Sequence, residues 1–191
     1  MFVINLLIPI FTLSLAIPLL TSATLIDSIY TNLSSDHCKT IQVVEETRDF
    51  IRRCAGVVGY SLLVEEFDAR QSVTILTPDG KQHPLRYGQV VTAAFSTVSE
   101  KAEWRVERKG GKIVPIALIV RVYASENPDS PNETVSYLAV AKIAPKKICL
   151  THRIKGGVTA NEEARQAADS SADKPCLQRN VSMVGGVLQE L

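Results

Sequence analysis

Side chains that could do chemistry gather in one short stretch of the chain. Glu65 and Glu66 end an apolar run, and Asp68 and Arg70 follow shortly after. Paired carboxylates are what glycoside hydrolysis requires, whereas Asp68 and Arg70, at alternate positions of an extended chain, would point to one side as a binding pair. A charged hairpin tip is the simpler alternative. We therefore take Glu66, Asp68 and Arg70 as candidate binding residues, with a carboxylate hydrolase near Glu66 and Asp68 as the rival hypothesis.

Aromatic residues are spread over the predicted strands, and Trp104 is the chain's single tryptophan. Packing in the core is the default for such side chains, but tryptophan is also enriched at binding surfaces. Trp104 therefore completes the set of candidate binding residues.

Other reactive residue types lack the spacing that catalysis or metal binding needs. His37, His83 and His152 are scattered without ligand spacing, which favours ordinary surface or edge histidines. The pairs Gly110-Gly111 and Gly156-Gly157 match neither a phosphate loop nor a dinucleotide fingerprint, and are interpreted as turns. The sequence thus predicts no catalytic residue, no metal site and no cofactor.

The charge of the chain is nearly balanced, at +1 for 191 residues. Binding to nucleic acid needs a sustained basic field, so a nucleic-acid partner is not expected. We expect a protein or cell-envelope partner instead.

The N-terminal segment predicts export. Residues 1–23 carry no charged side chain, are mostly apolar and end in Thr21-Ser22-Ala23, small residues that suit a signal peptidase. The first residues lack the usual Lys or Arg, so an uncleaved membrane anchor and a buried helix remain alternatives. Contact with a membrane is expected only if this segment is retained. The prediction is a periplasmic or secreted protein.

Four cysteines fit that compartment, and none forms a Cys-x-x-Cys pair. An even number behind a signal peptide indicates two disulfides, for which three pairings are possible. We favour Cys38–Cys54 with Cys149–Cys176, because each pair brackets one plausible supersecondary unit. In the chain-entropy account each bridge stabilises the fold by about 3 kcal/mol.

Strand patterns dominate the rest of the chain. Residues 60–64 and 71–76 predict a central hairpin, 104–107 and 112–123 a second hairpin, and 134–143 and 148–154 further strands. Thr159 to Glu162 matches a capping box and opens a predicted helix over 160–172. This pattern predicts an α+β fold: a mostly antiparallel sheet built from hairpins, with one C-terminal helix and two disulfides. We expect a loose leader at 24–37, a single stapled domain at 38–176 and a flexible tail at 177–191.

Two motifs, Cys38 with Arg53-Cys54-x-Gly56-x-x-Gly59-Tyr60 and the alanine-rich run 161–169, resemble exported bacterial proteins of uncharacterised function. This resemblance implies a disulfide-tied β domain and brings no activity with it. We therefore expect an exported, non-enzymatic binding or accessory module. The small hydrolase and a membrane-anchored scaffold protein are the alternatives.

Overall fold

The computed structural model describes residues 25–130 and 132–178 and, for the backbone alone, 181–184 and 187–190. The predicted signal peptide at 1–23 lies outside these residues. The described strands are β1 (Leu25–Asn32), β2 (Cys38–Val44), β3 (Asp49–Ala55), β4 (Ser61–Phe67), β5 (Arg70–Leu76), β6 (Gln82–Pro84), β7 (Ser96–Lys109), β8 (Lys112–Ala124), β9 (Val135–Ala144), β10 (Lys147–Lys155), β11 (Val181–Val184) and β12 (Val187–Glu190). The described helices are α1 (Tyr87–Val90), α2 (Ala160–Asp169) and a 3₁₀ turn at Ser35–His37.

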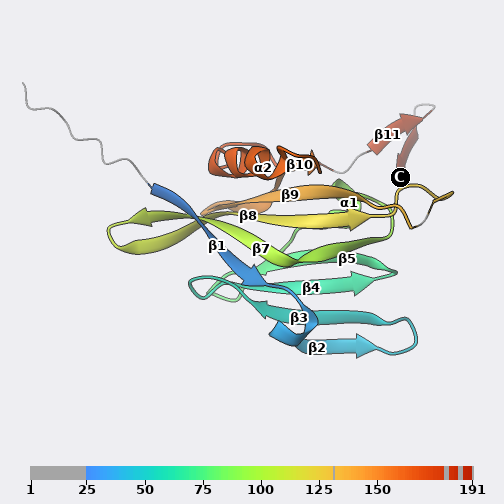
Figure 1. The fold of residues 1–191 in the computed structure, drawn as a ribbon, viewed down its shortest axis with the longest axis horizontal. Helices are drawn as coiled ribbons and strands as arrows, with labels where there is room; N and C mark the ends of the chain where they lie inside the picture. Colours follow the sequence, from blue (N-terminus) through green and yellow to red (C-terminus); the bar gives the residue numbers. More distant parts are fainter. Residues whose placement is uncertain (1–24, 131, 179–180, 185–186, 191) are drawn as a thin grey trace, which may run out of the picture.

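The main sheet has the strand order β10-β9-β8-β7-β5-β4-β3-β2, with β1 paired to β7 and β6 paired to β5 (Figure 1). Neighbouring hairpins make most of it antiparallel, as predicted. The prediction is wrong at one junction, because β5 and β7 pair in parallel where Arg70 faces Ser96. The chain between them crosses over through β6 and α1, and such a crossover returns in the same direction. The sheet is therefore mixed.

The two halves of this sheet enclose one hydrophobic core. Side chains of β3, β4 and β5 pack in the same cluster as side chains of β7, β8 and β9. Its largest fully buried members are Trp104, Tyr87, Leu62, Ile75 and Leu118. The opposite face of β8 and β9, which we call the outer face, carries α2 (Figure 1).

Both predicted disulfides are confirmed. Cys38 and Cys54 face each other across the β2–β3 hairpin, with their Cα atoms 4.3 Å apart. Cys149 on β10 is joined to Cys176 in the segment after α2, with a Cα–Cα distance of 5.7 Å. The second bridge holds this return segment beside β10, where the Leu177 N–H donates to the Leu150 carbonyl at 2.8 Å.

The loose leader predicted at 24–37 is wrong for most of its length. Residues 25–32 form β1 and pair with residues 101–108 of β7 without a break. Ile29 packs against the core, and Thr31 accepts a hydrogen bond from Trp104 Nε1 at 2.9 Å. The segment looked loose because its inward-facing side chains are partly polar, so alternation of apolar residues did not reveal a strand.

The helix α2 begins where predicted and ends earlier, at Asp169 rather than at residue 172. The hydroxyls of Ser170 and Ser171 donate back to carbonyls of the last turn, which ends the helix there. The predicted capping bond is absent from the described N-cap, where the Thr159 hydroxyl donates instead to the Glu163 carboxylate at 2.5 Å.

The helix is also not the C-terminal element that was predicted. The disulfide-linked return segment follows α2, and after it β11 and β12 pair as a separate two-stranded sheet. The rest of the predicted flexible tail, at 179–180, 185–186 and 191, lies outside the described residues.

Candidate functional site

The β4–β5 turn holds two of the side chains that the sequence singles out. Asp68 and Ala69 both have positive φ, 52° and 55°, which reverses the chain directly from β4 into β5. The Asp68 carboxylate forms an ion pair with Arg70 Nη1. Arg70 Nε also donates to the Ala93 carbonyl at 2.9 Å. The structure thus brings Asp68 and Arg70 together, but as partners of each other.

Glu66 is engaged in a separate local contact. Its carboxylate accepts a hydrogen bond from Gln71 Nε2 at 2.7 Å, across the β4–β5 pair. The ring of Phe67 beside it is exposed, as is that of Phe95 under the Arg70 guanidinium. The turn is therefore a charged hairpin tip with two exposed aromatic rings, in which the charged groups find partners nearby.

Trp104 is a core residue, and its place rules out the predicted contact with a partner. Its side chain is fully buried, lies edge-on to Tyr60 with ring centroids 5.9 Å apart, and donates to Thr31. A Cβ atom at Gly56 would come within 2.8 Å of the Trp104 ring. The strand around Trp104 therefore packs inward, and no part of the ring reaches the surface.

The main pocket lies where α2 stops covering the outer face. Side chains of β8 alternate between the two faces, and Ala117 and Ile119 on the outer face pack against Ala160, Ala164 or Ala168 of the helix. A helix of 10 residues is only about 15 Å long, so its first turn just reaches Arg121, through Asn161, and leaves Tyr123, farther along the same face, uncovered. The resulting pocket has a volume of about 550 Å³.

A bulge in β7 widens this pocket. Val98 and Ala102 of β7 pair with Val122 and Val120 of β8, so three residues of β7, 99–101, lie opposite the single residue Arg121. The bulge is held by the Leu33 N–H, which donates to the Glu100 carbonyl at 2.7 Å. Bulges of this kind redirect side chains and often border functional sites.

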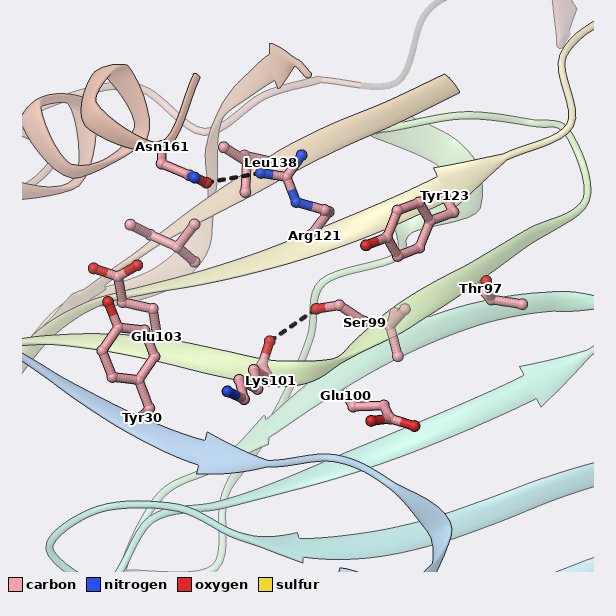
Figure 2. A pocket seen from close by; sticks show the side chains of 12 residues that line it. Tyr30, Thr97, Ser99, Glu100, Lys101, Glu103, Arg121, Tyr123, Leu138 and Asn161 are labelled. Carbon is pink, nitrogen blue, oxygen red and sulfur yellow. Dashed lines mark hydrogen bonds between the residues drawn. The ribbon is translucent and has the colours of Figure 1, made fainter. Parts of the chain in front are cut away.

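Arg121 is fixed at the centre of the pocket wall. Its Nη1 donates to Ser136 Oγ at 2.9 Å and its Nη2 donates to Asn161 Oδ1 at 2.7 Å. Figure 2 shows the guanidinium extended between β8 and the start of α2, with the Tyr123 ring on the same side. Both acceptors are neutral, so the geometry holds the cation in place without neutralising its charge.

A network of ion pairs joins α2 to the opposite wall of the pocket. Arg105 donates through Nε and Nη2 to the Asp169 carboxylate at 2.7 and 2.8 Å, and Arg165 Nε donates to Glu103 Oε1 at 2.7 Å. The Ser28 hydroxyl donates to the same Glu103 oxygen at 2.6 Å. These hydrogen bonds raise the pKa of Arg105 and of Arg165 above the usual arginine value.

Two exposed tyrosines and an apolar floor complete the pocket. Tyr30 on β1 and Tyr123 on β8, both labelled in Figure 2, expose 53% and 40% of their surface. The buried side chains of Ile119 and Leu138 form the floor. Apolar walls with a few fixed polar groups are typical of ligand sites. Glu66, Asp68, Arg70 and Trp104 do not line this pocket.

The histidines stay apart from both regions. His37 lies beside Asp36 in the 3₁₀ turn, His83 lies on β6, and His152 lies on β10. Burial, with a smaller effect of the Lys174 charge, lowers the pKa of His152. Across residues 25–130 and 132–178, no group of three or more His, Cys, Asp or Glu side chains is arranged to hold a metal ion.

Sequence reasoning missed the pocket because its residues come from distant parts of the chain. Tyr30, Arg121 and Asn161 are brought together only by the pairing of β1 with β7 and the docking of α2. One signal was present in the sequence: Arg121 interrupts a strand that is otherwise almost entirely apolar. A charged residue inside such a run has to lie on a solvent-exposed face of the sheet or in a binding or catalytic site.

Comparisons with protein families, with curated proteins and with solved structures found no match to this chain. In the part of the chain that the structure describes, no helix is both long and apolar enough to span a bilayer. Two disulfides are consistent with a compartment outside the cytoplasm.

Proposed function

We propose that this protein is an exported binding module, periplasmic or secreted, which holds a ligand or a segment of a cell-envelope or protein partner in the pocket beside α2. The observation that carries the proposal is the pocket itself: about 550 Å³, with a buried apolar floor, two exposed tyrosines and a fixed guanidinium. That volume lies within the range of small-ligand sites, roughly 300–1,000 Å³.

The state of three carboxylates, Glu66, Asp68 and Glu103, supports binding over hydrolysis. Glu103, in the pocket wall, already accepts hydrogen bonds from Ser28 and Arg165 on the same oxygen, and its charge is paired with that of Arg165. At the β4–β5 turn, Asp68 is paired with Arg70 and Glu66 with Gln71. A general acid or base must be able to exchange a proton with a substrate, and these carboxylates are held by other partners.

The disulfides and the N-terminal segment support the location. Disulfides persist in oxidising compartments, and both bridges tie down parts of the chain that frame the fold: the β2–β3 hairpin and the return segment after α2. Removal of residues 1–23 would release the mature module, while their retention would give the anchored form. Intact mass after export separates these two forms.

The test is affinity capture with the oxidised, exported protein against envelope and secreted extracts of its source. Three proteins are compared: the native one, Ser99→Trp, which places a large side chain in the pocket, and Thr47→Trp, a matched control on the exposed β2–β3 turn. We expect a saturable partner that the native and Thr47→Trp proteins retain and the Ser99→Trp protein loses. A partner captured equally by all three, or no partner at all, would contradict the proposal.

A further inference from the structure

The pocket contains a cation whose charge nothing in the described chain neutralises. Arg105 and Arg165, on the same face, are each paired with a carboxylate. Arg121 hydrogen-bonds only to a hydroxyl and an amide oxygen, and no carboxylate of residues 25–130 and 132–178 lies within ion-pairing distance of it. A half-buried guanidinium normally pairs with a carboxylate or a phosphate, in a two-pronged geometry that suits it.

The backbone around Arg121 is shaped to keep it in this position. Gly156 approaches so closely that a Cβ atom there would lie 2.1 Å from Ser136 Oγ and 3.3 Å from Arg121 Nη1. The Gly156 N–H donates to the Ser136 carbonyl at 2.6 Å. Only glycine fits at this position, and its absence of a side chain leaves room for the Ser136–Arg121 contact. The cation is therefore preorganised, which reduces the ordering that a ligand must impose on binding.

The bulge leaves the space that an anion would fill. Because residues 99–101 of β7 arch away opposite Arg121, no β7 residue pairs directly with it. Two carboxylates line the pocket: Glu103, which is held by Arg165 and Ser28, and Glu100, which is exposed on the bulge and forms no ion pair with Arg121. The Tyr123 ring and the Ile119 side chain line the same pocket as the cation and offer it an aromatic and apolar surface.

We infer that the pocket recognises a carboxylate attached to a group with an apolar or aromatic face, with the carboxylate on Arg121 and the rest of the ligand against Tyr123 and the Ile119–Leu138 floor. This inference rests on the proposed function and names the ligand class of the same site. Such a carboxylate occurs at the C-terminus of a peptide and in a sugar acid. The test distinguishes these two sources.

The experiment titrates the oxidised protein with matched pairs and follows the amide NMR signals of Gly156 and Gly157. The pairs are N-acetyl-phenylalanine with its amide, and glucuronate with glucose. In one pair or both, we expect the carboxylate to bind at least about tenfold more tightly than its neutral counterpart, because a charge-assisted hydrogen bond contributes at least that factor in affinity. The pair with the tighter carboxylate identifies the source as a peptide terminus or a sugar acid.

Two substitutions place the effect at Arg121. Arg121→Gln keeps hydrogen-bonding groups and removes the charge, so the preference for carboxylates should disappear. The amide NMR spectrum should remain that of a folded protein. Arg108→Gln is the matched control, since Arg108 is paired with Asp27 outside the pocket. An unchanged preference in Arg121→Gln, equal binding of charged and neutral members, or no shift with either carboxylate up to about 10 mM would overturn the inference. The capture experiment with Ser99→Trp does not depend on ligand charge, so the proposed function can stand if this inference fails.

Discussion

The β4–β5 turn and the pocket beside α2 are both rich in charge, but they satisfy it in opposite ways. At the turn, Asp68 pairs with Arg70, which is two residues away, and the Asp68 side chain is 86% exposed. Beside the pocket, the closest ion pairs join residues more than sixty positions apart, Arg105 to Asp169 and Arg165 to Glu103. Arg121 is left without a carboxylate among the described residues. Charges that neutralise each other locally need no further partner, whereas a fixed cation without a counterion is available to an anionic group.

The difference also appears in what holds each region. The turn needs only two residues with positive φ to form. The pocket exists only when β1 pairs with β7, β7 bulges opposite β8 and α2 docks on the outer face. A substitution that disrupts this long-range packing should therefore abolish the pocket and leave the conformation and ion pair of the turn intact.

The largest effect is expected from Trp104→Ala. A buried indole in the centre of the core leaves a large cavity when truncated, so the free energy of unfolding should fall by about 3 to 5 kcal/mol, measured by urea denaturation. A binding residue at the surface would change affinity and leave stability nearly unaltered. Weakened binding with unchanged unfolding would therefore return Trp104 to the candidate site.

A smaller loss is expected from Asp169→Asn, which removes one carboxylate from the ion-pair network that joins α2 to β7. Arg105 is 9% exposed and would lose its nearest charged partner, with the Glu103 carboxylate left at 3.9 Å, so the free energy of unfolding should fall by about 2 kcal/mol. Asp173→Asn is the control, since Asp173 is exposed and forms no ion pair within the described chain. Equal stability of the two variants would show that the network does not hold α2.

The amount of this structure that sequence could predict follows the same division. Both disulfides and the hairpins of β4–β5 and β7–β8 were predictable because their signals are local: turn residues, alternation and nearby cysteines. The placement of Asp68 and Arg70 on one side of the chain was predictable for the same reason. The sequence could not show that the two charges would bind each other rather than a ligand, since that depends on side-chain geometry at the turn.

The remaining features depend on long-range packing, which leaves little trace in the sequence. The bulge at residues 99–101 is not marked by any characteristic amino-acid composition. The polar segment β1 is extended because it pairs with β7. The face to which Trp104 points is set by register, and a shift by one residue would reverse it. Arg121 inside an apolar run was the one local sign of the pocket.

Ala69→Gly should stabilise the protein modestly. Ala69 has a φ of 55°, a left-handed conformation that is costly for any residue with a Cβ atom. After allowing for the greater freedom of glycine in the unfolded chain, we expect a gain of about 0.5 to 1 kcal/mol in the free energy of unfolding. Binding at the pocket should not change. A loss of stability would contradict the assignment of strain to this turn.

The smallest effect is expected from Asp68→Asn. An exposed ion pair contributes little, so the free energy of unfolding should move by less than about 0.5 kcal/mol, and ligand affinity should be unaltered. Calorimetric unfolding together with the capture experiment checks both. A loss of binding or of turnover with this variant would move the functional site to the turn.

The central claim is that the pocket, and not the turn, meets the partner, and photo-crosslinking tests it most directly. A photoreactive phenylalanine is placed at position 123 in the pocket or at position 67 beside the turn, both in partly exposed aromatic side chains at strand ends. With each protein oxidised and exposed to the same extracts, we predict a saturable adduct from position 123 and none from position 67. An adduct from position 67 with none from position 123 would contradict the claim.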